Sequence, residues 1–198
     1  MKNEAKLLGC VASACIFSHV TYDENFYKIQ VNIQRESGTF DRLPVIVSEK
    51  LIDVSQDYTG QYIYIEGEFR SHNIEDEEGK KHLFLAVFAQ DAFFTDSAEP
   101  MNSIILEGAI CKPTTFRKTP LGRQISDVML AVNRQYGKSD YIPCVAWGRN
   151  ATLSARLNQG QHISIYGRIQ SREYTKRIDD LEDIRTAYEV SVIKLGET

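Results

Sequence analysis

The chain has 198 residues, of which 42% are hydrophobic and 25% are charged. This composition is ordinary for a folded protein and excludes wholesale disorder, a collagen-like chain and a disulfide-dense miniature. The apolar runs all fall short of the ~18–20 residues that cross a bilayer, and the N-terminal segment predicts no secretion signal. Four scattered cysteines predict reduced thiols and a cytoplasmic location.

The net charge of −4 conceals an asymmetry between the two halves. Residues 1–100 hold 9 Lys and Arg against 17 Asp and Glu, whereas residues 101–198 hold 14 against 10. Residues 101–177 alone carry 12 basic and 4 acidic groups. The overall pI of about 5.6 argues against a polyanionic partner, but the basic half can still bind one.

An internal repeat organises the chain. At an offset of 99 residues, the coinciding pairs include Arg35 with Arg134, Asp41 with Asp140, and Pro44 with Pro143. At an offset of 100 they include Gly60 with Gly160, Gly67 with Gly167, and Ser71 with Ser171. A period near 100 predicts two copies of one domain, residues 1–98 and 101–198, joined by a short polar linker.

The predicted elements of the second copy follow in chain order. Apolar residues alternate around residues 128–132, 163–169 and 188–192, and a further strand, the third, carries Tyr141 and Trp147 on one face. Residues 149–157 have helical spacing instead. This order, β-β-β-α-β-β, is that of the OB fold. We therefore expect an all-β protein of two tandem OB folds, which are five-stranded Greek-key barrels, each with a short helix between strands 3 and 4.

Aromatic and basic side chains alternate with the core residues of the second copy. The fourth strand carries Tyr166, Arg168, Arg172, Tyr174 and Lys176, and the third carries Tyr141 and Trp147, followed by Arg149. The hairpins add Arg117, Lys118, Arg123, Arg134, Tyr136 and Lys138. Aromatic faces stack on bases and cations meet phosphates in single-stranded nucleic acid. Each of these features alone is also consistent with a solvated surface, and a lone tryptophan is also consistent with a core anchor. The convergence of the aromatic and basic side chains on one barrel face favours a binding face.

The first copy keeps the core positions but not the aromatic ones. Arg42 stands where the second copy has Tyr141, Ser48 stands for Trp147, and Glu66 stands for Tyr166. We therefore expect residues 1–98 to form a degenerate, acidic OB-fold domain with a structural or assembly role, and residues 101–198 to be the basic DNA-binding domain.

The second copy resembles bacterial single-stranded DNA-binding proteins. The segments that carry the resemblance are 102–108 (NSIILEG), 130–134 (LAVNR), 140–148 (DYIPCVAWG) and 167–174 (GRIQSREY). The resemblance implies that aromatics at Tyr141, Trp147 and Tyr174 stack on bases, and that four OB folds assemble, here as a homodimer. It also implies non-catalytic work in DNA replication, recombination or repair, in the cytoplasm and at the nucleoid. The same pattern is similar to primosomal OB-fold proteins.

Two alternatives stay open at this point. The acidic first domain favours, as the alternative function, a replication-restart adaptor with secondary nucleic-acid binding, and stacking does not separate DNA from RNA. The sequence has no CxxC pair, no phosphate-binding glycine loop and no HExxH or GxSxG motif. We therefore expect neither a metal, a cofactor nor an enzymatic activity.

Overall fold

The computed structural model describes residues 2–75, 79, 81–178 and 181–197, and is almost entirely β-sheet. The first half forms β1 (Asn3–Val11), β2 (Ile16–Thr21), β3 (Glu24–Gln34), β4 (Phe40–Ser48), β5 (Tyr62–Glu75) and β6 (Lys81–Thr95). The second half forms β7 (Met101–Ile110), β8 (Thr115–Lys118), β9 (Gln124–Asn133), the 3₁₀ turn η1 (Gln135–Gly137), β10 (Ser139–Trp147), α1 (Arg149–Ser154), β11 (His162–Ile178) and β12 (Leu181–Glu197). Within the described residues, no helix is long and apolar enough to cross a membrane.

Each half closes into a barrel by the same pairings. In the first half, β1 pairs antiparallel with β3 and β5, β5 pairs with β6, and β6 closes in parallel on β4 at Val45↔Val87. The second half repeats this with β7, β9, β11 and β12, and β12 closes on β10 at Cys144↔Val190. The predicted pair of OB folds is confirmed.

Two details differ from the prediction. A short additional strand, β2 or β8, follows the first strand of each copy, so Arg117 and Lys118, which were expected in a hairpin, lie on β8. The helix between strands 3 and 4 forms only in the second copy, because residues 49–61 make turns instead. There, the Asp53 carboxylate accepts hydrogen bonds from Ser55, and the Asp57 carboxylate accepts them from Thr59. Such local bonds offer the backbone an alternative to the helix.

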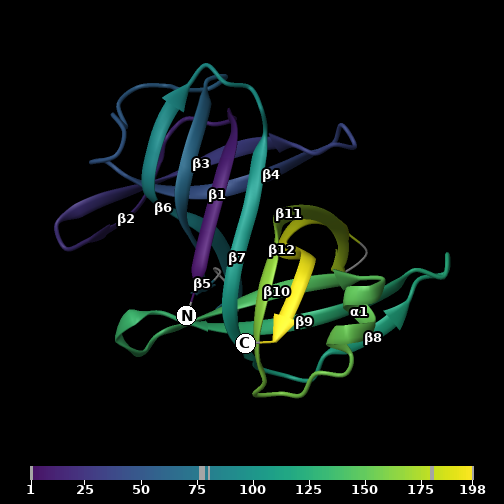
Figure 1. Ribbon diagram of the computed structural model, residues 1–198. Helices are drawn as coiled ribbons and strands as arrows, with labels where there is room; N and C mark the ends of the chain where they lie inside the picture. The colour runs from purple at the N-terminus through teal and green to yellow at the C-terminus, as the bar shows by residue number, and fades with distance from the viewer. Residues whose placement is uncertain (1, 76–78, 80, 179–180, 198) are drawn as a thin grey trace.

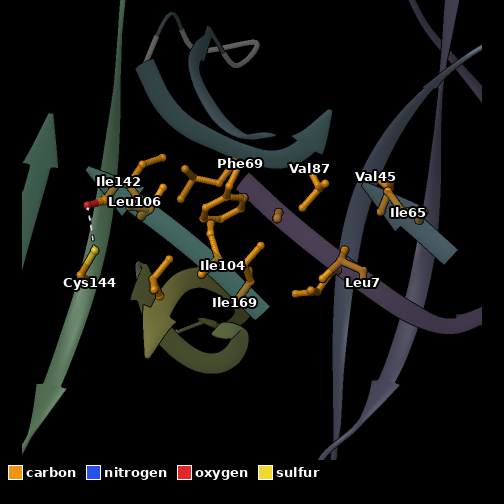
Figure 2. Packing of buried hydrophobic residues seen from close by; sticks show 14 of the residues in the cluster. Leu7, Val45, Ile65, Phe69, Val87, Ile104, Leu106, Ile142, Cys144 and Ile169 are labelled. Atoms are coloured by element: carbon orange, nitrogen blue, oxygen red, sulfur yellow. Dashed lines mark hydrogen bonds between the residues drawn. The ribbon is translucent and has the colours of Figure 1, made fainter. Parts of the chain in front are cut away.

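The inward-facing apolar side chains of both barrels form one buried cluster. Figure 2 shows its middle, where Phe69 of the first barrel lies close to Ile104 of the second. Gly67 and Gly167 stand at equivalent positions, where the backbone of the neighbouring strand comes very close to the glycine. A Cβ added to them would lie 2.1 Å from the Phe88 carbonyl oxygen and 2.3 Å from that of Ser191. The repeated glycines therefore mark where the fourth and fifth strands of each barrel approach too closely for a side chain.

The barrels are joined edge to edge through their first strands. β1 and β7 pair antiparallel from Asn3↔Leu106 to Leu8↔Met101, so all twelve strands belong to one sheet. Figure 1 shows the two barrels on either side of this junction. A central sheet of β6, β5, β1, β7, β11 and β12 therefore runs across both halves.

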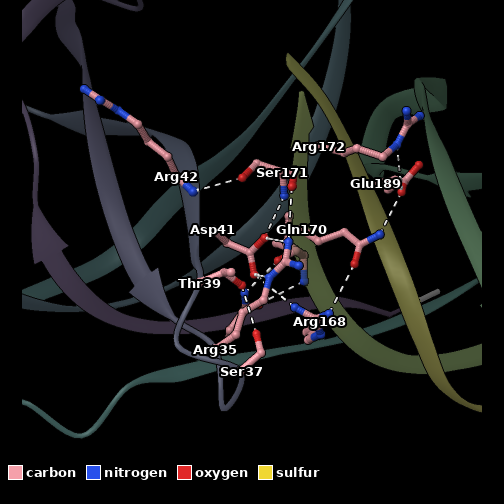
Figure 3. A network of polar contacts seen from close by, with 12 residues as sticks. Arg35, Ser37, Thr39, Asp41, Arg42, Arg168, Gln170, Ser171, Arg172 and Glu189 are labelled. Atoms are coloured by element: carbon pink, nitrogen blue, oxygen red, sulfur yellow. Dashed lines mark hydrogen bonds and ion pairs between the residues drawn. The ribbon is translucent and has the colours of Figure 1, made fainter. Parts of the chain in front are cut away.

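A buried polar network also crosses between the barrels (Figure 3). The Asp41 carboxylate, 1% exposed, accepts hydrogen bonds from Arg35 and, in the other barrel, from the Ser171 N–H at 2.8 Å and Arg168 Nη1 at 3.0 Å. Its repeat counterpart Asp140 accepts from Arg134 and from the Ser71 N–H. The coinciding Arg, Asp and Ser of the repeat thus build a pseudo-two-fold interface.

Candidate nucleic-acid interface

A groove of about 570 Å³ runs along the outside of the second barrel. Trp147, at the end of β10, lines it together with Arg117 of β8 and Arg172 of β11. Trp147 is 41% exposed, so its indole ring is a surface platform and not a core anchor. An indole face beside two guanidinium groups can stack on a base and meet the adjoining phosphates.

Arg117 and Arg172 of this groove each have an acidic neighbour. Arg117 Nε lies 3.1 Å from Asp127 Oδ2, and this hydrogen bond raises the pKa of the Arg117 guanidinium. Arg172 Nε lies 3.7 Å from Glu189 Oε1, which also accepts a 2.7 Å hydrogen bond from Gln170. A phosphate entering the groove must therefore compete with Asp127 and Glu189.

Tyr174 borders a neighbouring groove of about 660 Å³ that lies between the barrels. The Arg172 guanidinium lies 5.8 Å from the centre of its ring, a cation–π distance. Leu83 and Leu85 of β6, in the first barrel, also line it. The structure thus brings Tyr174 to the edge of the second barrel's binding face, next to the first barrel.

Three predicted residues lie elsewhere. Tyr166 is opposite Ile105 and Lys194, on the outer face of the central sheet, and does not line the Trp147 groove. β11 pairs with β7 only up to Gly167, so its outward side chains before and after that point border different strands. Arg168 and Arg134 are held by Asp41 and Asp140 in the inter-barrel network. Their geometry is that of structural ion pairs rather than of an open binding face.

The remaining predicted residues are spread around the second barrel. Tyr141 is exposed at the boundary between the barrels, where its N–H donates to Ser71 Oγ at 2.8 Å. Lys118, Arg123 and Arg149 are exposed, and Lys138 borders a groove on the first barrel. The side chains of Tyr136 and Lys176 lie outside the described residues.

The sequence analysis missed an aromatic cluster on the first barrel. Phe17, His19, Phe26, His72, Phe84 and Phe88 come together from β2, β3, β5 and β6. Most of these rings stand at positions where the second copy has no aromatic side chain, so the repeat did not indicate them. The density of aromatics and histidines in residues 17–27 and 82–88 was the available signal. Among the described residues, no group of three or more potential metal ligands gathers.

Comparisons with known proteins agree with this architecture. Residues 101–195 match the model of the Single-strand binding protein family. A single-stranded DNA-binding protein of Clostridium tetani is 37% identical over 81 residues, which cover 37% of this chain and 56% of the relative. One from Oceanobacillus iheyensis is 29% identical over 100 residues, 47% of this chain and 59% of the relative. The chain thus spans about half the length of the curated relatives it matches.

The fold of the whole chain also has a solved counterpart. The wild-type single-stranded DNA binding protein from Thermus aquaticus superposes with a TM-score of 0.76 at 19% identity, covering 100% of this chain and 93% of that one. The likeness extends over both barrels and shows the tandem fold. The expected resemblance of the second copy to bacterial single-stranded DNA-binding proteins is therefore confirmed by the family match of residues 101–195.

Proposed function

We propose, from the family match of residues 101–195, that this protein binds single-stranded DNA without catalysis and largely without sequence preference. In this role it serves DNA replication, recombination or repair, in the cytoplasm at the nucleoid. The observation that carries the proposal is the groove in which Trp147 is exposed beside Arg117 and Arg172. The descriptions of the relatives favour DNA binding over the adaptor alternative.

The chemistry of the groove accounts for tolerance of sequence. Every base offers a π-face to the Trp147 ring, and truncation of such a stacking ring costs about 1–3 kcal/mol per base. Arg117 and Arg172 neutralise phosphates and release condensed counterions, so the affinity falls as salt rises. Tyr174 and Tyr141 extend the aromatic surface toward the first barrel, and the exposed Lys118, Arg123 and Arg149 add positive charge to the second barrel.

Trp147 makes the proposal directly testable, because it is the one tryptophan of the chain. Titration with oligo(dT) at two salt concentrations is expected to quench its fluorescence, with weaker binding at the higher salt. Trp147→Ala is expected to lower the affinity about ten-fold or more on several sequences alike. The matched control is Phe40→Ala, which removes an exposed ring outside the groove. Unchanged fluorescence together with full affinity of Trp147→Ala would refute the proposal.

DNA and RNA are separated by a competition titration. Matched deoxy- and ribo-oligonucleotides compete for the same groove, and we expect DNA to displace RNA at equal concentration. Preference for RNA would reassign the substrate while keeping the stacking role of Trp147.

We also propose that two chains associate, giving four barrels. The outer face of the central sheet presents Phe93, Met101 and Tyr166, each at least 40% exposed. The register of the paired strands places Phe93 beside Tyr64, and Tyr166 beside Ile105. These side chains therefore lie on a broad sheet surface. Light scattering at micromolar concentration is expected to give a dimer, and Phe93→Glu a monomer. A monomeric wild type would overturn this part.

A further inference from the structure

A groove of about 660 Å³ lies on the first barrel, in the half of the chain with excess acid. Its lining comes from β2, β3, β5 and β6, which are the counterparts of the strands that form most of the Trp147 groove. The groove is therefore on the same face of the first barrel as the Trp147 groove is on the second.

The walls of this groove are aromatic. The His19 and Phe26 rings stack with centroids 5.0 Å apart and an interplanar angle of 7°. The His72 ring lies 4.7 Å from that of Phe84. Phe17 is 56% exposed and lines the same groove. The groove thus offers several ring faces to a planar ligand, as stacking platforms for bases do.

The charges of this groove oppose the charge of its barrel. None of its described lining residues is acidic, whereas it contains Lys28 and Arg70, with the Arg70 guanidinium 5.0 Å from the Phe88 ring centre. At the equivalent positions of the second barrel, Asp127 replaces Lys28 and Gln170 replaces Arg70. Ala86, which pairs with Arg70 on the neighbouring strand, stands where Glu189 pairs with Gln170 in the second barrel. Two acids of the described residues pair with cations of this groove. Glu68 is paired with Arg70 at 2.7 Å, and the buried Asp140 accepts a hydrogen bond from Arg134.

The second barrel completes this groove. Arg134 and Lys138, from the β9–β10 hairpin, line it beside the histidines. Arg134 is fixed there by Asp140 and by the Ser71 carbonyl, to which its Nη2 donates at 2.9 Å. The inter-barrel network thus carries a cationic hairpin from the second barrel to the rim of the first-barrel groove.

We propose that this groove is a second binding site for single-stranded DNA, built from side chains different from those of the Trp147 groove. Phe17, His19 and His72 stack on bases, and Lys28, Arg70 and Lys138 meet phosphates. This inference rests on the proposed function and extends it to the acidic barrel. Single-stranded DNA that leaves this groove reaches the second barrel along the hairpin of residues 134–138.

The test counts occupied grooves in the full-length chain. An oligo(dT) of about 8 nucleotides suits a single OB fold, whose site size is about 4–16 nucleotides. Stoichiometry from sedimentation is expected to be two oligonucleotides per wild-type chain and one for the double variant Phe17→Ala/His72→Ala. Both replaced side chains are exposed. The matched control on the same barrel is Phe40→Ala, which is expected to bind two oligonucleotides. A wild type that binds one, or a double variant that still binds two, would overturn the second site.

The Trp147 signal separates this test from the test of the proposed function. If only the second site fails, oligo(dT) still quenches Trp147 while the double variant matches the wild type. If the proposed function fails, Trp147 does not respond. Photocross-linking with 5-iodouracil in the oligonucleotide gives an independent readout. Adducts are expected on peptides that contain Phe17 or Phe84 as well as Trp147, and adducts confined to the Trp147 peptide would refute the second site.

Discussion

The Asp140 carboxylate accepts a hydrogen bond from the backbone N–H of Ser71, which lies 69 positions earlier and in the other barrel. The reverse contact joins Asp41 to the Ser171 N–H. Each barrel thus supplies one buried carboxylate to a strand of its neighbour. Because both contacts are made by repeated residues, the interface is pseudo-symmetric although it lies within one chain.

Asp140→Ala is expected to destabilise the protein by about 3 kcal/mol, because it leaves the Arg134 charge and the Ser71 N–H without their partner. Urea unfolding measures the change. Asp23→Asn, in an exposed turn, is the control and is expected to stay within about 0.5 kcal/mol of the wild type. Equal stability of Asp140→Ala and the wild type would show that the network does not hold the barrels together.

Asp127→Asn is expected to tighten binding of single-stranded DNA several-fold at low salt. The change removes a carboxylate that competes with phosphate for Arg117, at 3.1 Å. The gain should shrink at high salt, because it is electrostatic. Oligo(dT) titrations followed by Trp147 fluorescence measure it. Asp23→Asn makes the same charge change away from the groove, and an equal gain there would indicate a general charge effect instead.

Gly167→Ala is expected to destabilise the second barrel by several kcal/mol, since the added Cβ would lie 2.3 Å from the Ser191 carbonyl oxygen. Gly196→Ala on β12 is the matched control. Its Cβ would meet only Ser164 Oγ, at 3.0 Å, which can rotate away. Thermal unfolding distinguishes the two, and similar melting temperatures would contradict the close approach.

Binding at the first-barrel groove is expected to tighten as the pH falls. Partial desolvation of the His72 ring in the groove lowers its pKa, and Arg134 and His19 lower it further, while Asp140 acts in the opposite direction. Of the other groups around it, Arg70 and Lys138 are cations and Phe84 and Phe88 are neutral. A bound phosphate would raise this pKa, so binding takes up a proton and strengthens below the ordinary histidine value of about 6.5.

Trp147→Ala isolates this groove for the measurement. Its affinity for oligo(dT) is expected to rise between about pH 7.5 and pH 5.5. Adding His72→Gln should remove part of that rise. A flat profile in Trp147→Ala would exclude the histidines from contact with the DNA backbone.

The sequence by itself determined the repeat and the fold class. Alternating apolar residues such as Ile163 and Ile165 are buried as expected, because strand periodicity is local. The repeat predicted two barrels, because equal spacing of core positions requires equal folds. Strand alternation also predicted an exposed Trp147, and this side chain is exposed beside Arg117 and Arg172, while its role in binding stays a prediction.

Only the tertiary structure decided which charged and aromatic side chains share a surface. Arg134 and Arg168 have the same sequence character as Arg117, yet both are held in the inter-barrel network. Arg168 is paired with Asp41 across the barrel boundary, and Arg134 is paired with Asp140 of its own barrel and donates across the boundary to the Ser71 carbonyl. Phe17, His72 and Phe84 are far apart in the chain and come together because β2, β5 and β6 close around one barrel. Strand order and closure are long-range properties, and no local pattern of residues encodes which outward-facing side chains they bring together.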